Sequence, residues 1–343
     1  MTLHCAFIGF GKSTTRYHLP YVLHRKDRWQ VAHIYRRRAK PEEQAPQYSH
    51  IHFTSDLEEV LNDPLVKLVV VCTHADSHFE YAKKALEAGK TCWWKSRSPR
   101  RWRKQNSVCP GEQQRSDGDA LSEPPFRLLL PDHQKVIESG KLGELVEIES
   151  HFDNYRPLAE TNPAVRKTAS SMALACIPDQ IISLFGRPDH VSYDLRSLRN
   201  KANPDDTFEA QLFYGDMKAI VKTSHLVQID YPKFIVHGHK GSFVKYGIDQ
   251  QETSLKANVM PGEPGFGADD SVGELVYVNE AGEMVREAVP LESGDYGRVY
   301  DALYDTLVNG QPNYVKETDV LTNMEILQRG FEQPSPATIT LTR

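Results

Sequence analysis

The sequence predicts an α/β fold in which a doubly wound parallel sheet is followed by a separate α+β domain. In the first half, short apolar segments alternate with helical ones, which is typical of parallel strands covered on both faces. In the second half, apolar and polar residues alternate along longer segments, which is typical of an antiparallel sheet with one solvated face. The chain of 343 residues is long enough for two such domains, and we expect them at residues 1–123 and 124–343.

A glycine-rich turn follows the first predicted strand, Cys5–Ile8, and leads directly into a helix. Strand, turn and helix in this order predict a dinucleotide-binding unit. The first glycine permits the tight turn, the second lets the backbone approach a pyrophosphate, and the helix N-terminus offers N–H groups to an anion. The cofactor-binding residues predicted here are Gly9, Gly11, Lys12, Ser13 and Thr14, the last of which replaces the usual third glycine.

Two other interpretations of this turn remain open. Gly11-Lys12-Ser13 resembles the end of a P-loop, but position 6, where that loop needs a glycine, is Ala6. Residues 5 to 8 also have the composition of a buried strand rather than of a loop. The turn could otherwise belong to an ordinary strand–turn–helix unit that binds no ligand.

The second predicted strand, Trp29–Tyr35, ends in three arginines, Arg36-Arg37-Arg38. In NAD-binding units this strand normally ends near an Asp or Glu that binds the ribose 2′-hydroxyl. Guanidinium groups match the geometry of a phosphate instead. Arg36 and Arg37 therefore predict NADP as the cofactor, with NAD as an alternative. Without a ligand, the same arginines would form a solvated basic turn.

A continuous β-branched segment, Val66–Thr73, predicts a further strand that is buried on both faces, and an amphipathic helix, His78–Glu87, follows it. Ligands of parallel sheets lie beyond the carboxyl ends of the strands. The residues predicted to line the cofactor at this strand end are Cys72, Thr73 and His74. His78, in the first turn of the helix, is either a cofactor-binding residue or an ordinary helical residue.

Composition excludes several classes of partner. A net charge of -5 with a pI near 6.3 argues against nucleic acid as the main partner. The five cysteines are scattered and lack the spacing of metal ligands, which predicts a reducing compartment and no metal site. The first strand begins close to Met1, and no apolar segment approaches membrane-spanning length. We therefore expect a cytoplasmic protein that binds neither membranes nor nucleic acid.

The second half predicts an antiparallel sheet in which Gly215-Asp216 forms a hairpin turn. A last helix is expected at Tyr296–Asn309. The predicted strands are Leu145–Phe152, Phe208–Tyr214, Ala219–Ser224 and Lys233–Gly238.

Several segments, in their order and spacing, resemble the glucose–fructose oxidoreductase / inositol dehydrogenase / MocA-type (Gfo/Idh/MocA) family of NAD(P)-dependent oxidoreductases. The matching segments besides the terminal helix are Ala6–Gly11, Val69–Thr73 with His78, Ala85–Lys90, Ile137–Glu144 and Val236–Ser242. The resemblance implies a Rossmann domain and then a domain with a large, open, mostly antiparallel sheet that serves to form a homodimer. It also implies hydride transfer between a nicotinamide cofactor and a sugar, polyol or related hydroxyl compound.

The family's catalytic signature is absent where the resemblance implies it. Neither Glu-Lys-Pro after Gly89-Lys90 nor the downstream Gly-x-His-x-x-Asp is present. Residues 91–103 contain Trp93-Trp94, five basic residues and no β-branched aliphatic residue, which is a poor composition for a central strand. We therefore expect residues 91–133 to be irregular.

A shifted reading frame explains both absences. Permitted codons for Lys90 to Arg103, read from the third base of Lys90, can encode Asn-Val-Leu-Val-Glu-Lys-Pro, which restores the strand and the motif. Codons for Val165 to Pro178, read from the third base of Val165, can encode a segment that ends in Gly-Val-His-Thr, and with an intervening Met codon Asp179 completes the second motif. Our hypothesis is that residues of about 91–134 and 165–178 are out of frame, which resequencing of the gene tests.

In the family, the lysine and the histidine act as acid/base groups around the substrate hydroxyl. The lysine's position falls here at Ser96, beside Lys95, and the histidine's at about Cys176. The candidate catalytic residues are therefore Lys95 and Asp179. Lys95 could equally be an exposed surface lysine, and Asp179 a residue that starts a helix.

Three functions remain open at this point. The first is an NADP-dependent oxidoreductase that acts on a sugar, polyol or related hydroxyl compound. The second is a catalytically silent dinucleotide-binding sensor that works through partners, because no intact acid/base pair is present. The third is a product prone to misfolding, because part of the first domain is replaced by incompatible sequence.

Overall fold

The structure is a computed structural model that describes residues 1–94, 120–122, 131–158, 177–247, 249–268, 271–290, 294–333 and 335–341. It divides into two compact units. The first unit comprises Met1–Pro125, Gln251–Phe266 and Asp295–Lys316, and the second comprises Phe126–Gln250, Gly267–Gly294 and Glu317–Arg343. Two late segments of the chain thus group with the first unit. The boundary between residues 123 and 124, as a division into independent domains, stays a prediction.

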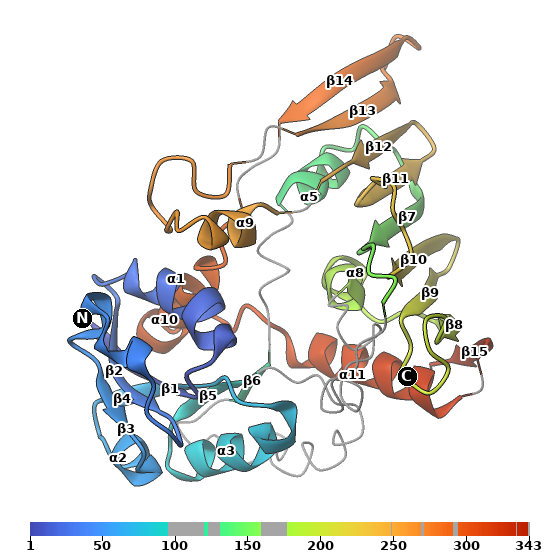
Figure 1. Cartoon of the computed structure of the whole chain (residues 1–343). Helices are drawn as coiled ribbons and strands as arrows, with labels where there is room; N and C mark the ends of the chain where they lie inside the picture. Colours follow the sequence, from blue (N-terminus) through green and yellow to red (C-terminus); the bar gives the residue numbers. More distant parts are fainter. Residues whose placement is uncertain are drawn as a thin grey trace. The chain divides into compact units, whose positions relative to one another are not determined.

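A parallel sheet forms the centre of the first unit, as predicted (Figure 1). Among the described residues it has six strands in the order β3-β2-β1-β4-β5-β6, and every neighbouring pair is parallel. The strands are β1 (Leu3–Ile8), β2 (Trp29–Tyr35), β3 (His52–Thr54), β4 (Val66–Val71), β5 (Thr91–Trp94) and β6 (Ala120–Ser122). The apolar side chains of β1 and β4 are almost completely buried, which explains why their composition predicted central strands.

The helices of the first unit are short apart from two. They are η1 (Ser13–His18), α1 (Leu19–Leu23), η2 (Pro41–Gln44), η3 (Pro46–Tyr48), α2 (Leu57–Leu61), α3 (Ala75–Glu87), α9 (Gln251–Lys256) and α10 (Arg298–Asn309). The sequence predicted the start of α3 at His78, which is wrong by one turn. The helix starts directly after His74, so that His78 lies beyond its first turn.

Strand β5 corrects the expectation that residues 91–133 are irregular. Thr91–Trp94 pair in parallel with β4 and with β6, and all four residues are buried. The first turn of helix α5 also falls in that region. The other residues of the region, 95–119 and 123–130, lie outside the described part of the chain.

The tryptophans of β5 pack on opposite faces of the sheet. Trp94 belongs to the same hydrophobic cluster as Ile8, Val71 and Ala85. Trp93 is 3% exposed, and its ring lies edge-on to His18 at 4.9 Å and to Tyr300 at 5.4 Å between centroids. Burial on both faces of the sheet therefore accommodates two aromatic residues in a strand whose composition alone did not predict a strand.

A mixed sheet dominates the second unit. Among the described residues it has nine strands in the order β14-β13-β12-β11-β7-β10-β9-β8-β15. These strands are β7 (Leu145–His151), β8 (His190–Arg196), β9 (Thr207–Tyr214), β10 (Met217–Ser224), β11 (Phe234–Gly238), β12 (Gly241–Lys245), β13 (Val272–Val278), β14 (Met284–Pro290) and β15 (Ala337–Thr340). The predicted mostly antiparallel sheet is confirmed. One neighbouring pair, β7 with β10, is parallel, so the carboxyl ends of these two strands lie at the same edge.

Three helices of the second unit are described: α5 (Pro131–Glu138), α8 (Ile177–Phe185) and α11 (Glu317–Glu332). Helix α11 packs against α8 and β8, and Tyr193 of β8 donates a hydrogen bond to the carbonyl of Ile326. The prediction that Tyr296–Asn309 is the last helix is wrong, because α11 follows it. Helix α11 was not predicted because it is less amphipathic than α10. Its buried face includes the polar residues Asp319 and Thr322 beside apolar ones.

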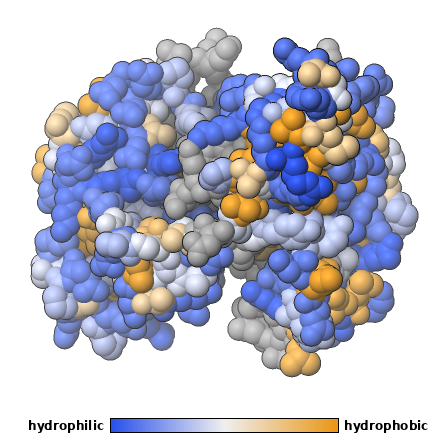
Figure 2. Space-filling view, turned by 90° about the horizontal axis from the view of Figure 1, so that it is seen from above, coloured by the Kyte–Doolittle hydropathy of each residue, from blue (hydrophilic) through white to orange (hydrophobic). Residues whose placement is uncertain are grey.

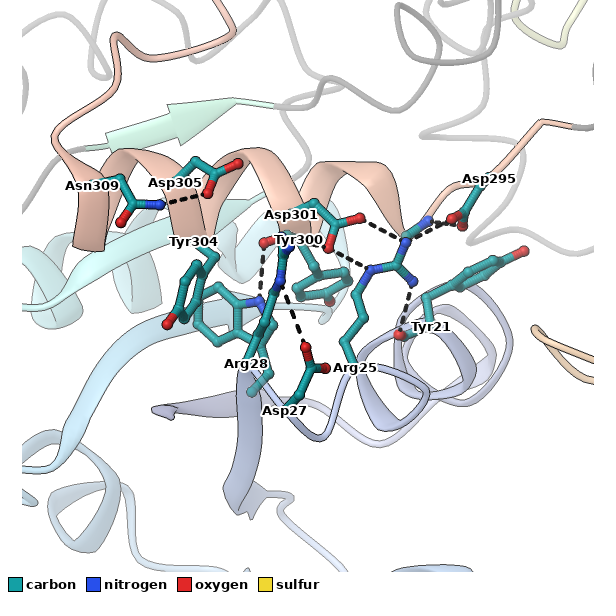
Figure 3. Close-up of polar contacts among 12 residues, drawn as sticks. Tyr21, Arg25, Asp27, Arg28, Asp295, Tyr300, Asp301, Tyr304, Asp305 and Asn309 are labelled. Atoms are coloured by element: carbon teal, nitrogen blue, oxygen red, sulfur yellow. Dashed lines mark hydrogen bonds and ion pairs between the residues drawn. The ribbon is translucent and has the colours of Figure 1, made fainter. Parts of the chain in front are cut away.

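A buried arginine ties helix α10 to helix α1 within the first unit (Figure 3). Arg25 donates to both carboxylate oxygens of Asp301, at 3.0 and 2.8 Å, to Asp295 at 2.6 Å and to the carbonyl of Tyr21. Burial alone would lower the pKa of Arg25, but the hydrogen bonds to Asp301 and Asp295 raise it above its ordinary value. The guanidinium is thus charged, and each of its three nitrogens donates a hydrogen bond.

Removal of one partner from this network should destabilise the protein. We expect Asp301→Ala to lower the free energy of unfolding by about 1.5–3 kcal/mol, because Arg25 stays buried with part of its charge uncompensated. Asp305→Ala on the same helix is the matched control, since Asp305 pairs only with the exposed Asn309 among the described side chains, and should change stability by less than about 0.5 kcal/mol. Urea denaturation followed by circular dichroism measures both. Equal losses would show that the network contributes nothing.

On the face that Figure 2 shows, hydrophilic residues predominate and hydrophobic ones form interrupted patches. Within the described parts of the chain, every helix is too short or too polar to span a lipid bilayer.

Candidate functional site

Three strand ends meet at Gly9 in the first unit. The N–H of Gly9 donates to the carbonyl of Tyr35 at the end of β2, at 2.8 Å. The N–H of Cys72, just after β4, donates to the carbonyl of Ile8 at the end of β1, also at 2.8 Å. The predicted cofactor residues after β1, β2 and β4 are therefore brought to one edge of the sheet, where parallel sheets bind ligands.

The two glycines of the turn are needed for different reasons. Gly9 has a φ of +113°, and a Cβ atom there would lie 2.8 Å from the carbonyl oxygen of Cys72. The chain's own packing thus requires glycine at this position. A Cβ on Gly11 would meet no atom within 4 Å. Packing does not explain Gly11, whereas close approach of a pyrophosphate to the backbone does, so the turn fits a dinucleotide.

Thr14 closes the turn in place of the third glycine. Its side chain is fully buried, and its hydroxyl donates to the carbonyl of Gly9 at 2.6 Å. The helix that starts at Ser13 is a π-helix, a geometry that occurs often at functional sites. Lys12 precedes it and is exposed. The hydroxyl of Thr14 thus braces the turn while Lys12 remains at the surface.

The loop after β4 is held by side chains of α3. His78 is 8% exposed, and its Nε2 donates to the carbonyl of Thr73 at 2.7 Å. Ser77 donates to the hydroxyl of Thr73 at 2.9 Å. His74 is exposed, whereas Cys72 and Thr73 are partly buried. In this structure His78 orients the strand end, and its predicted contact with a cofactor stays a prediction.

The arginines after β2 differ in their surroundings. Arg37 is exposed, but Arg36 donates from Nε and Nη2 to the carboxylate of Glu43, at 2.7 and 2.9 Å. The same carboxylate accepts the N–H of Lys40 at 2.8 Å, and the ammonium of Lys40 donates to the carbonyl of Phe10 at 2.5 Å. The basic segment therefore reaches across to the glycine turn.

The Arg36–Glu43 pair is ionic. The side chains of Arg36 and Glu43 are only 16% and 10% exposed. Burial alone would raise the pKa of the Glu43 carboxyl, but hydrogen bonds from Arg36 and from the Lys40 N–H lower it. The hydrogen bond with Glu43 raises the pKa of Arg36. Both groups are consequently charged at neutral pH.

A second cluster of ionisable groups lies in the second unit, where β7 and β10 end. We call it the His151 cluster, and it comprises Glu149, His151, Asp153 and Lys233. The ring of His151 is 4% exposed; its Nε2 lies 2.9 Å from Glu149 and its Nδ1 lies 3.3 Å from Asp153. The ammonium of Lys233 donates to the carbonyl of His151. Asp153 also accepts the N–H of Ser224 at 2.8 Å, which ties the end of β7 to the end of β10.

Aromatic side chains surround this cluster. The ring of Tyr231 lies 4.8 Å from that of His151, and the ammonium of Lys233 lies 4.4 Å from the centre of the Phe152 ring. Phe152 and Tyr231 are 41% and 44% exposed. Acidic, basic and aromatic groups thus lie together where β7 ends.

The candidate catalytic residues have different positions. Asp179 is buried in the first turn of α8. Its neighbour Gln180 accepts a hydrogen bond from Ser150 of β7 at 3.4 Å, and because successive side chains of a strand point to opposite faces, this contact puts the start of α8 on the face of β7 opposite to the side chains of Glu149 and His151. Lys95, Ser96 and Cys176 lie outside the described residues. The catalytic roles of Lys95 and Asp179 stay predictions.

Sequence analysis missed Glu43, Lys40 and the His151 cluster. One signal for the cluster was available: β7 ends in His151-Phe152-Asp153, so a histidine and a carboxylate follow directly on an alternating strand. No comparable signal identified Glu43, because its pairing with Arg36 depends on the conformation of the intervening loop. Among the described residues, no group of three His, Cys, Asp or Glu side chains is placed to hold a metal ion.

Comparison with known families matches both halves of the chain. A family model described as the NAD-binding Rossmann fold of the oxidoreductase family matches residues 3–92. A second, described as the C-terminal alpha/beta domain of the same Gfo/Idh/MocA oxidoreductase family, matches residues 134–340. Residues 93–133 fall in neither match, whereas residues 165–178 fall within the second, and the reading-frame hypothesis stays a prediction.

Individual relatives cover the whole chain. It is 68% identical over 355 residues to the uncharacterized oxidoreductase YhhX of Escherichia coli, with full coverage of both chains. It is 26% identical over 348 residues to the NADP(+) scyllo-inositol 2-dehydrogenase IolW of Bacillus subtilis, covering 96% of this chain and 93% of IolW.

Solved structures of oxidoreductases also superpose on the whole chain. A crystal structure of YhhX superposes with a TM-score of 0.92 at 66% identity over the full length of both chains. An oxidoreductase from Bacillus cereus superposes with a TM-score of 0.90 at 39% identity, covering 100% of this chain and 99% of that one.

Proposed function

Because the chain belongs to the Gfo/Idh/MocA family of oxidoreductases, we propose that it is an NADP-dependent enzyme acting on a sugar, polyol or related hydroxyl compound. It transfers hydride between the substrate carbon and the nicotinamide ring. The observation that carries the proposal is the glycine turn, where Gly11 serves no packing purpose and three strand ends converge. The basic segment beside that turn supports NADP over NAD.

The cofactor site lies at the sheet edge of the first unit. Gly9 and Gly11 leave room for the pyrophosphate, and the helix that begins at Ser13 directs N–H groups to it. Arg36 and Arg37 receive the ribose 2′-phosphate. Cys72, Thr73 and His74 line the remaining edge, with His78 holding Thr73 in place. The bound nicotinamide supplies the hydride acceptor or donor.

The His151 cluster supports a hydroxylated substrate. Carboxylates and an ammonium group bind several hydroxyls, and exposed aromatic rings cover the apolar face of a sugar ring. Asp179 lies in the first turn of α8, on the other face of β7, and is a separate candidate. A proton leaving the substrate hydroxyl passes to a basic group, for which Lys95 is the candidate that the sequence offers.

The second unit also supports a homodimer. None of the residues of edge strand β14 is buried, and Val272, Val278 and Met284 at the β13–β14 hairpin are 54%, 45% and 78% exposed. An open sheet with apolar residues on an exposed strand pair is suited to contact with a second copy. We place the enzyme in the cytoplasm.

Titration of the protein with NADPH and NADH, followed by nicotinamide fluorescence, tests the cofactor. NADPH should bind more tightly, and Arg36→Asp should narrow or reverse the preference, because a carboxylate repels the 2′-phosphate and accepts a 2′-hydroxyl. Lys26→Asp, an exposed charge reversal of the same size, is the control and should leave the preference unchanged. Tighter binding of NADH by the unaltered chain would contradict the assignment of NADP.

A further inference from the structure

The contact that sets the charge of the proposed phosphate site is the Arg36–Glu43 pair. Glu43 occupies the Nε–Nη2 edge of the guanidinium, the edge that a phosphate would use for a two-point contact. The carboxylate is held by a third hydrogen bond from the N–H of Lys40, at the start of helix η2. The position of Glu43 is therefore built into the loop.

Resting on the proposed function, we propose that Glu43 is a specificity-determining residue that limits the preference of this chain for NADP over NAD. Its carboxylate neutralises Arg36 and competes with the 2′-phosphate for the same guanidinium edge. When NADP is bound, the guanidinium of Arg36 either contacts both the 2′-phosphate and Glu43 or loses its contact with Glu43. With NAD bound, the pair can remain intact, and the carboxylate is an acceptor for the ribose 2′-hydroxyl.

Lys40 provides the second part of the argument. Its backbone holds Glu43, while its ammonium reaches the carbonyl of Phe10 between the two glycines. The lysine thus leaves one positive charge at the glycine turn that Glu43 does not neutralise directly. This charge and the exposed Arg37 provide the residual attraction for the 2′-phosphate, so NADPH remains favoured, but only modestly.

Dissociation constants of NADPH and NADH for four variants test this inference. Glu43→Gln should bind NADPH about tenfold more tightly, with NADH changed less than about threefold, because a full carboxylate charge beside the phosphate is removed. Arg36→Gln should weaken NADPH at least about tenfold, because Glu43 then faces the phosphate uncompensated. The double variant Arg36→Gln/Glu43→Gln should fall between the two.

Glu42→Gln is the matched control. Glu42 is the preceding residue of the same short helix and is exposed, so the substitution removes an equal charge away from Arg36. It should change the NADPH constant by less than about twofold, since exposed charges are screened. Thermal unfolding of each variant checks that the loop substitutions leave the fold intact.

The outcomes separate this inference from the proposed function. If the unaltered chain binds neither dinucleotide, the proposed function fails and this inference fails with it. If it binds NADPH but Glu43→Gln binds it equally or more weakly, Glu43 orients Arg36 instead, and only the present inference is overturned. If Glu42→Gln and Glu43→Gln tightened NADPH binding equally, the net charge of the loop would explain the effect, and the present inference would also be overturned.

Discussion

Replacement of residues 91–134 and 165–178 by the in-frame family sequence should raise the turnover number with NADP and a polyol by about 10²–10⁴-fold. A positioned group for proton transfer is typically worth that factor. The replacement returns Glu-Lys-Pro after β5 and Gly-Val-His just before Asp179, the aspartate at the start of α8. NADPH formation from NADP, measured by absorbance with a panel of polyols, compares the two proteins directly.

One variant of the restored chain serves as the control for this experiment. A chain with the restored segments in which the lysine of Glu-Lys-Pro is changed to alanine should lose most of the gain, because it regains the strand but not the acid/base group. Equal turnover by the original and the restored chains would show that catalysis does not depend on these motifs. The family mechanism would then be wrong for this protein, and the catalytically silent sensor would be favoured.

Truncation of Trp93 should destabilise the protein more than any other single change considered for it. We expect Trp93→Ala to lower the free energy of unfolding by about 3–5 kcal/mol, the usual cost of removing a large buried aromatic side chain. The ring of Trp93 is almost completely buried and contacts the rings of His18 and Tyr300, and its strand lies between β4 and β6 in the sheet. Guanidinium denaturation followed by far-ultraviolet circular dichroism measures the loss.

Trp93→Phe is the matched variant, because it keeps an aromatic ring in the same position. It should lose less than about half as much stability as Trp93→Ala, since much of the cavity stays filled. A loss below about 1 kcal/mol for Trp93→Ala would contradict the packing of β5 in the sheet and restore the expectation of an irregular segment.

The strands that the sequence predicted correctly are those whose residue pattern matches their burial in the folded sheet. Strand β2 was predicted with its observed bounds and β4 to within two residues, because β-branched, apolar segments bury themselves in the centre of a sheet. Strand β5 was missed because the composition of its residues is unfavourable for a strand, and its pairing with β4 and β6 stabilises it. Tertiary environment overrode propensity there, as it commonly does for strands.

The candidate site was predictable to the extent that it depends on strand ends. The residues after β1, β2 and β4 were brought together at Gly9 as the rule for parallel sheets predicts. The role of Thr14 as a brace was not predictable, because the bond of its hydroxyl to Gly9 depends on the geometry of the turn. Glu43 and Lys40 were missed for the same reason, since their contacts are made by a loop rather than by a periodic element.

The late position of Tyr300 in the chain has a consequence for folding order on the ribosome. Its carbonyl accepts the indole N–H of Trp29, its hydroxyl lies 2.9 Å from Nδ1 of His18, and its ring contacts Trp93. These three partners are synthesised some 200 residues or more before it. During translation the nascent first unit therefore keeps this apolar surface uncovered while most of the second unit emerges. Such long-range closure slows folding and lengthens the exposure of the nascent chain to chaperones and to aggregation.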